Sequence, residues 1–373
     1  MKKLFTSIIL TVITVATAYA QIADGFYYIK NRHSGRYMSI QDNDPSHYKV
    51  STTAGDVKLA GIRTYKNWSD VCTMPSCVIY IKRINVSNNQ YDFEAQGSSL
   101  YKLSGNKLYA TLKPQGDGSY IGSGTYKGMT ASLSEFKIDP SLDESWLGTN
   151  DNSAKYWIPV PVNTGDNYIG IKPDVHTDDG YYGTIYAGFA FKLASSGMKA
   201  YYISEASGSK ITLKEISGTI PAATPVIIKC ASNDPAKNKI EPVTSGGTAA
   251  TGNKLKGVYC ASTVRGFNTV TPYLPETMRI LGKSNGKIAF VKVDISSDAL
   301  KDGNIKANKA YLAVPSGSAD VMTESGTGIT TIMAEGISKD KEGLFTLTGI
   351  RIPDNVTPQP GIYIKDGKKI VIK

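Results

Sequence analysis

The chain has 373 residues, among them 36 glycines and 23 tyrosines, and a formal net charge of +10 at pH 7. Its basic residues lie in short runs beside acids, which favours a solvated surface over a clustered nucleic-acid-binding patch. A spread basic surface would still favour acidic glycans or lipopolysaccharide. A chain of this length exceeds what one hydrophobic core usually supports, so two or three domains are expected.

The N-terminus has the pattern of a secretory signal peptide. Lys2-Lys3 precede an apolar run from Leu4 to Ala16 and the small-x-small sequence Ala18-Tyr19-Ala20. This order predicts a signal peptide over residues 1–20, cleaved before Gln21. The alternative, a membrane anchor, needs about 20 apolar residues, and this run is shorter. We expect an exported protein that does not span the membrane. It would lie outside the cell or on the outer cell surface, with the periplasm as the alternative.

The rest of the sequence predicts an all-β chain. Short runs rich in Tyr, Ile, Val and Thr alternate with Gly-, Ser-, Asn- and Asp-rich turns, and no window of ten residues keeps the 3.6-residue period of a helix. In residues 21–195 a strand pattern recurs. Strands at 27–30, 78–82 and 156–160 are each followed by a strand led by Tyr. Three such units predict a β-trefoil, a barrel-like fold without long free edges.

The first unit, GFYYIKNRHSGRYMSI, resembles the opening of ricin-type β-trefoil domains, and the resemblance extends over residues 24–193. It implies a lectin-like domain that binds carbohydrate. Ricin-type sugar sites carry a Q-x-W motif in each repeat, whereas no Gln of this chain is followed two residues later by Trp. The segment Gly188-Phe189-Ala190-Phe191 keeps the packing aromatic of that motif and lacks its Gln.

Residues 196–317 predict a second β domain, of β-sandwich type. Strand-like runs at 201–203 and 210–213 flank a Ser-Gly-Ser turn, and further runs continue to residue 314. From AYYISEASGSKITLKEISGTIPAATPVIIK to NKAYLAVP, this region resembles a β module of exported Bacteroidetes proteins.

Residues 318–373 predict a linker followed by a short β tail. The final run GIYIKDGKKIVIK predicts a hairpin, because Asp366-Gly367 is a preferred two-residue turn between twisted strands. The tail resembles the C-terminal sorting domain of type IX secretion cargo, which implies contact with the secretion machinery. The alternative is an ordinary docked hairpin that completes the sheet of the second domain.

Four cysteines in an exported chain allow two disulfides. One pair would close a short loop, and the other two cysteines each end an apolar run, as neighbouring strands would. The alternative is four buried free thiols. The disulfide candidates are Cys72, Cys77, Cys230 and Cys260.

The sequence contains no HExxH, GxSxG or CxxC motif, and its three histidines have no marked catalytic partner. We therefore predict no enzyme activity, no cofactor and no metal site. Tyrosines in Gly-rich loops suit sugar rings and protein contacts, since each has a flat face and a hydroxyl. The residues predicted to bind a ligand are Trp146, Asp179, Tyr181, Tyr182 and Tyr126.

These observations predict an exported, non-enzymatic binding protein. Its β-trefoil would recognise carbohydrate or a component of a host or cell surface, and nucleic acid is not an expected partner. One alternative is a structural or adhesion protein that binds other proteins. The other is a glycan hydrolase whose carboxylates come from distant loops, since a carboxylate pair is set in three dimensions and not by sequence spacing.

Overall fold

A computed structural model divides the chain into two compact units, Met1–Thr330 and Thr331–Lys373. It describes residues 21–40, 49–50, 57–58, 62–87, 89–99, 102–103, 106–126, 132–138, 145–147, 156–261, 270–323, 344–346, 351–352, 358, 360–365 and 368–372. The predicted signal peptide lies outside these residues. Within them, no helix is long and apolar enough to cross a membrane.

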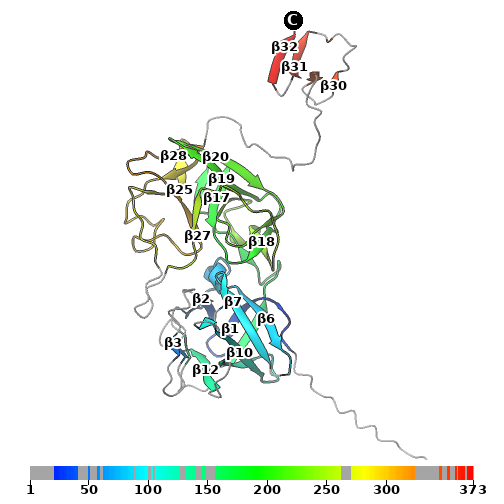
Figure 1. Ribbon diagram of the computed structural model, residues 1–373, viewed down its shortest axis with the longest axis vertical. Helices are drawn as coiled ribbons and strands as arrows, with labels where there is room; N and C mark the ends of the chain where they lie inside the picture. Colours follow the sequence, from blue (N-terminus) through cyan, green and yellow to red (C-terminus); the bar gives the residue numbers. More distant parts are fainter. Residues whose placement is uncertain are drawn as a thin grey trace, which may run out of the picture. The chain divides into compact units, whose positions relative to one another are not determined.

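Six strands of the first unit close into a barrel, and Figure 1 labels four of them, β1, β6, β7 and β10. Around the ring the order is β1, β6, β7, β10, β11, β14, and neighbouring strands pair antiparallel. The ring is closed because β14 pairs with both β11 and β1. Closure satisfies backbone groups that an open sheet leaves unpaired at its edges. The six are β1 (Gly25–Asn31), β6 (Ile79–Asn85), β7 (Gln90–Ala95), β10 (Asn106–Pro114), β11 (Tyr120–Tyr126) and β14 (Tyr156–Pro161).

Short strands lie between barrel strands in three places. β2 pairs with β5 after β1, β8 and β9 extend β7 and β10, and β12 pairs with β13 after β11. Three units of four strands arranged in this way form a β-trefoil, so the predicted all-β class and N-terminal trefoil are confirmed. The bounds are β2 (Tyr37–Ile40), β3 (Lys49–Val50), β4 (Val57–Lys58), β5 (Ile62–Tyr65), β8 (Ser98–Ser99), β9 (Lys102–Leu103), β12 (Ser132–Ile138) and β13 (Ser145–Leu147).

The repeats start at different residues from those predicted. β6, expected to open the second unit, is the last strand of the first, and β14, expected to open the third, closes the barrel against β1. The two assignments look alike in sequence because the barrel strands all present large apolar or aromatic side chains to the same interior. That interior includes the buried side chains of Ile29, Ile81, Phe93, Leu112 and Trp157.

Strands from Ile169 onward pair only with one another among the described residues of the first unit. The predicted domain boundary at residue 195 therefore falls inside this second region. Its four-stranded sheet runs in the order β15, β23, β18, β21, and its ten-stranded sheet in the order β16, β17, β22, β19, β20, β28, β26, β25, β27, β24.

The bounds of the four-stranded sheet are β15 (Ile169–Gly170), β23 (Lys239–Val243), β18 (Ala190–Leu193) and β21 (Thr219–Ile220). Those of the larger sheet are β16 (Val175–Thr177), β17 (Gly180–Ile185), β22 (Val226–Cys230), β19 (Lys199–Ser207), β20 (Lys210–Ile216), β28 (Val321–Thr323), β26 (Lys287–Val291), β25 (Met278–Ser284), β27 (Lys309–Ala313) and β24 (Leu255–Val258).

The ten-stranded sheet curls until β27 lies beside β17. The backbone N–H of Ala310 donates to Thr184 Oγ1 at 3.2 Å, and that of Tyr186 donates to the Asn308 carbonyl at 2.9 Å. Buried side chains fill the inside of the curl, among them Tyr201, Phe290 and Leu312. The smaller sheet packs on the outer face of β19 and β22, as in a sandwich.

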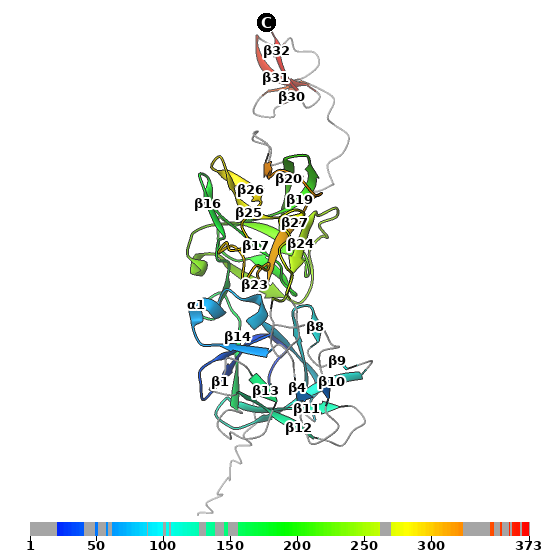
Figure 2. The same ribbon diagram turned by 90° about the vertical axis from the view of Figure 1, so that its left-hand side faces the viewer.

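The barrel and the second region share a hydrophobic core. Val71, Cys77 and Val78 come from the first trefoil unit and pack in one cluster with Ile171 and Ile228 of the second region. The short helices α1 (Trp68–Val71) and η2 (Pro75–Cys77) supply Val71 and Cys77, and Val78 follows η2 directly. Figure 2 shows α1 where the two regions meet. A continuous core predicts that the two regions unfold together.

The four cysteines are free and buried, so the predicted disulfides are wrong and the alternative of four thiols holds. Burial raises the pKa of the Cys77 and Cys230 thiols to about 12. Apolar runs that end in Cys proved to be core strands, in which a thiol packs as a small apolar group.

The second unit, Thr331–Lys373, contains one four-stranded sheet in the order β30, β29, β31, β32. The predicted terminal hairpin is confirmed, because Lys365 pairs with Lys368 and Gly361 with Ile372. The turn residues Asp366-Gly367 lie outside the described residues. The strands are β29 (Leu344–Thr346), β30 (Arg351–Ile352), β31 (Gly361–Lys365) and β32 (Lys368–Ile372).

Candidate functional site

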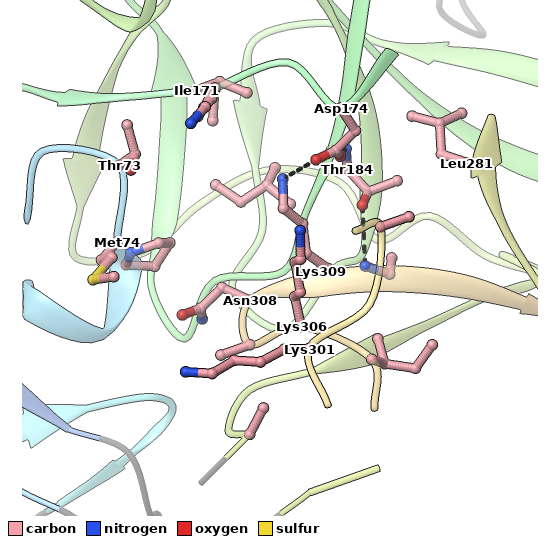
Figure 3. A pocket seen from close by; sticks show the side chains of 18 of the residues that line it. Thr73, Met74, Ile171, Asp174, Thr184, Leu281, Lys301, Lys306, Asn308 and Lys309 are labelled. Atoms are coloured by element: carbon pink, nitrogen blue, oxygen red, sulfur yellow. Dashed lines mark hydrogen bonds and ion pairs between the residues drawn. The ribbon is translucent and has the colours of Figure 1, made fainter. Parts of the chain in front are cut away.

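Two hollows lie where the barrel meets the second region. The larger, here called the lysine cavity, has a volume of about 520 Å³, within the range of roughly 300–1,000 Å³ typical of small-molecule sites. The loop Thr73–Ser76 of the first trefoil unit forms one side, and residues 305–310 form another. Figure 3 labels Lys301, Lys306 and Lys309 among the side chains that line the cavity.

Positive charge dominates the lysine cavity. Four lysines and two aspartates line it, which leaves an excess of two positive charges. Lys309 pairs with Asp174 at 2.7 Å, and Lys306 donates to the backbone carbonyl of Asp298. The side chains of Lys172 and Lys301 have no hydrogen bond or ion pair among the described residues.

A buried amide pair fixes the wall of the lysine cavity. Asn308 Nδ2 donates to Gln96 Oε1 at 2.9 Å, and Gln96 Nε2 donates back to Asn308 Oδ1 at 3.2 Å. Asn308 Nδ2 also donates to the Tyr186 carbonyl at 2.9 Å. The pair joins the second trefoil unit to the start of β27, so the barrel itself holds this wall in place.

The smaller hollow, here called the aromatic cleft, has a volume of about 290 Å³. Phe26 of β1 and Tyr80 of β6 lie in it with ring centroids 4.9 Å apart, and Phe189 lies 5.7 Å from Phe26. Glu94 of β7 stands directly opposite Tyr80 in the antiparallel ladder. Burial, and then the charges of Asp24 and Glu94, raise the pKa of the Tyr80 hydroxyl.

Beneath the aromatic cleft, Gly188 of the second region lies directly against the backbone of the trefoil at Gln96 and Gly97. A Cβ on Gly188 would lie 2.1 Å from the Gly97 nitrogen and 2.5 Å from the Gln96 carbonyl carbon. No side chain fits at this contact, which therefore holds backbone of the second region against backbone of the trefoil. The cleft has a rigid base and a partly exposed aromatic wall.

Three of the residues predicted to bind a ligand lie together, but outside the trefoil. Asp179, Tyr181 and Tyr182 belong to the hairpin of β16 and β17, in the second region. Asp179 Oδ2 accepts from the buried Tyr182 hydroxyl at 2.7 Å and lies 3.2 Å from Lys229 Nζ. Tyr181 stacks on His176 with centroids 4.4 Å apart. Tyr182 is part of the core, whereas Tyr181 remains partly exposed.

The environment of this hairpin favours an ionised Asp179 beside a protonated Tyr182. Burial opposes the charge of Asp179, but hydrogen bonds from Thr177, Tyr182 and Lys229 outweigh it and lower its pKa. Burial and the bond to Asp179 raise the pKa of Tyr182. Asp179 and Tyr182 are already bonded to each other, so the shifts of their pKa values follow from contacts within the second region and need no ligand to explain them.

The other two predicted residues lie on trefoil strands. Trp146 is on β13 opposite Lys137, and Tyr126 is on β11 opposite Leu108. Their side chains lie outside the described residues. Strand pairing places neither residue on the sheet that carries Asp179, and a single site formed by all five residues stays a prediction. Among the described residues, no group of three metal-ligating side chains could hold a metal ion.

Sequence reasoning missed both hollows because their residues come from distant segments. Phe26, Tyr80 and Glu94 stand on three strands, and only the β1–β6 and β6–β7 ladders bring them side by side. A cluster of lysines between residues 301 and 309 was visible in the sequence. Without the fold it looks like an ordinary solvated run.

No protein-family model matches the chain, and neither does any curated protein. A solved structure that matches is the designed three-fold symmetric protein ThreeFoil, at 12% sequence identity and a TM-score of 0.25. The match covers 37% of this chain and 99% of ThreeFoil. A TM-score this low carries no argument, so the trefoil assignment rests on the closed ring of strand pairs.

Proposed function

We propose that the chain is an exported, non-enzymatic binding protein that recognises carbohydrate through its β-trefoil, at the aromatic cleft. The observation that carries the proposal is the placement of Phe26 and Tyr80 beside the carboxylate of Glu94. A sugar ring has an apolar face of C–H groups and an edge of hydroxyls. Aromatic faces suit the former, and a carboxylate accepts hydrogen bonds from the latter.

The size and rigidity of the aromatic cleft support a short saccharide as the ligand. A volume of about 290 Å³ is near the lower end for small-molecule sites. The glycine contact beneath the cleft ties its two sides together, so little ordering is needed on binding. The aromatic pair and the carboxylate, Phe26, Tyr80 and Glu94, come from the barrel strands β1, β6 and β7, which supports a site carried by the trefoil.

Export and sorting belong to the same proposal. Residues 1–20 have the order of a signal peptide, and the terminal sheet would serve as the segment that the secretion machinery recognises. In a host with type IX secretion, deletion of residues 331–373, the second compact unit, should leave the protein in the periplasm. Export of the shortened chain to the medium would show instead that the tail is an ordinary terminal sheet.

The experiment is a glycan array with residues 21–373 at low and raised salt. We expect salt-resistant binding to defined neutral sugars, weakened about tenfold by Tyr80→Ala and by Glu94→Gln, since an aromatic contact or a charged hydrogen bond contributes roughly 1–2 kcal/mol. Tyr202→Ala and Glu205→Gln are the matched controls, because both residues lie on β19, no residue of which lines the cleft.

Each other outcome has a defined meaning. Loss of binding in Tyr181→Ala but not Tyr80→Ala would move the site to the β16–β17 hairpin and contradict the proposal. Binding only to acidic glycans and only at low salt would indicate plain charge attraction. Turnover of any glycan would contradict the non-enzymatic part, and no binding at all would favour a protein ligand.

A further inference from the structure

We propose that the lysine cavity is a second binding site, which takes a small amphipathic anion: an acidic group carried on an apolar body. This site is separate from the aromatic cleft, and its argument does not use the proposed carbohydrate binding. It rests on the charge, the wall chemistry and the fixed geometry of the cavity.

The charge selects an anion. Lys301 is exposed, and its ammonium has no partner among the described residues; the same holds for Lys172. Two unpaired ammonium groups at one cavity of about 520 Å³ would attract and hold a negative group. A carboxylate, sulfonate or phosphate monoester supplies that group, because each accepts several hydrogen bonds from lysine.

The walls select an apolar body. Aliphatic side chains dominate between the lysines and the floor, with Tyr65 as the aromatic ring among the described lining residues. A sugar would gain little from such walls, whereas an alkyl chain or fused ring would bury its apolar surface against them. The aliphatic members include Met74, Pro75, Ile171, Ile280, Leu281 and Ile305.

A third lysine of the cavity, Lys309, forms an ion pair with Asp174. Asp174 Oδ1 pairs with Lys309 Nζ at 2.7 Å (Figure 3). Asp174 Oδ2 accepts from the Thr184 backbone N–H at 2.8 Å. The side chains of Lys309 and Asp174 are 26% and 28% exposed, so both reach the cavity. The carboxylate cancels the charge of Lys309 and opposes an incoming anion.

This arrangement predicts two substitutions with opposite effects. Lys301→Gln removes an unpaired cation and should weaken binding of an amphipathic anion about tenfold, the equivalent of one charged hydrogen bond. Asp174→Asn keeps an acceptor for the Thr184 N–H but releases Lys309, and it should tighten binding several-fold. Lys283→Gln is the matched control, because Lys283 is an exposed lysine of β25 that does not line the cavity.

The experiment is isothermal titration calorimetry of residues 21–373 with decanoate, its neutral counterpart decanamide, and inorganic sulfate, below the micelle concentration of decanoate. We expect saturable binding of one decanoate, at least tenfold weaker binding of decanamide, and no measurable binding of sulfate. Lys301→Gln should weaken decanoate binding, Asp174→Asn should strengthen it, and Lys283→Gln should leave it unchanged.

Four results would overturn the proposal. Absence of decanoate binding would exclude the site, and equal binding of decanamide would exclude a role for the charge. Sulfate binding as tight as that of decanoate would reduce the cavity to an inorganic anion site. Equal effects of Lys301→Gln and Lys283→Gln would indicate general surface charge. None of these results bears on Tyr80 or Glu94, so the proposed carbohydrate site is tested independently.

Discussion

The amide pair between Gln96 and Asn308 leads to a quantitative prediction about how the two regions of the first unit are joined. Asn308 is buried, has a left-handed backbone with φ of 58°, and makes three side-chain hydrogen bonds. Asn308→Gly removes these bonds without straining the backbone, since glycine adopts positive φ freely. At about 0.5–1.5 kcal/mol per hydrogen bond, the loss is roughly 2–4 kcal/mol in the free energy of unfolding.

The control for this variant is the same substitution at a matched backbone position. Asn285 has φ of 49° and is exposed in the turn between β25 and β26. Asn285→Gly therefore carries the same entropic cost of glycine without the buried bonds. The difference between the two variants isolates the contribution of the amide pair.

Urea unfolding, followed by tryptophan fluorescence and far-UV circular dichroism, is the assay. We expect a single transition with both probes, and a loss for Asn308→Gly that exceeds the loss for Asn285→Gly by about 2–4 kcal/mol. A difference below roughly 0.5 kcal/mol would refute the reasoning, because the pair would then contribute less than one ordinary hydrogen bond. Two separated transitions would refute the shared core.

Three further predictions concern the same unit. Gly188→Ala should destabilise the fold by more than about 2 kcal/mol, because the new Cβ would overlap trefoil backbone. Gly165→Ala is the control, since its Cβ would meet only the side chain of Asn163, and urea unfolding compares the two variants. Iodoacetamide at pH 8 should label no cysteine in the folded protein, because all four are buried and burial raises the pKa of Cys77 to about 12. After denaturation without reductant it should label all four, and fewer labels by mass spectrometry would indicate a disulfide. The folded-state pKa of Asp179 is lowered from 3.8, so its stabilisation is complete above that pH and is lost as pH falls through the lower folded value. The advantage of wild type over Asp179→Asn should therefore shrink below pH 3.8, by less than about 1 kcal/mol because the side chain is 61% exposed; acid unfolding curves would show an unchanged gap if the pairing did not matter.

The sequence was sufficient for the fold class and insufficient for the repeat boundaries. Turn spacing and β-branched runs indicate strands wherever they occur, so the all-β class and the terminal hairpin followed directly. Which strand opens a repeat depends on partners far along the chain. β14 resembles an opening strand because it is rich in aromatic and β-branched residues, and only its pairing with β1 shows that it closes the barrel.

The sites were harder to predict for the same reason. Tyr181 and Tyr182 stand next to each other in sequence but point to opposite faces of β17, so one is core and one is partly exposed. Phe26 and Tyr80 are 54 positions apart and meet through the β1–β6 ladder, where they are direct partners. Local composition identifies candidate aromatic residues, but the register between strands decides which of them share a surface.

The closing strand β14 sets the order in which the chain can fold. Tyr28 of β1 pairs with Val160 of β14, so the two paired residues are 132 positions apart in the sequence. Pairings of such long range slow folding, because the loop entropy is lost before the contacts form. Until residues 156–161 are present, β1 and β11 each keep an open edge that could template association with another chain. A ribosome that still holds residues 156–161 therefore keeps the barrel open, and folding of the trefoil is delayed until synthesis has passed its last strand.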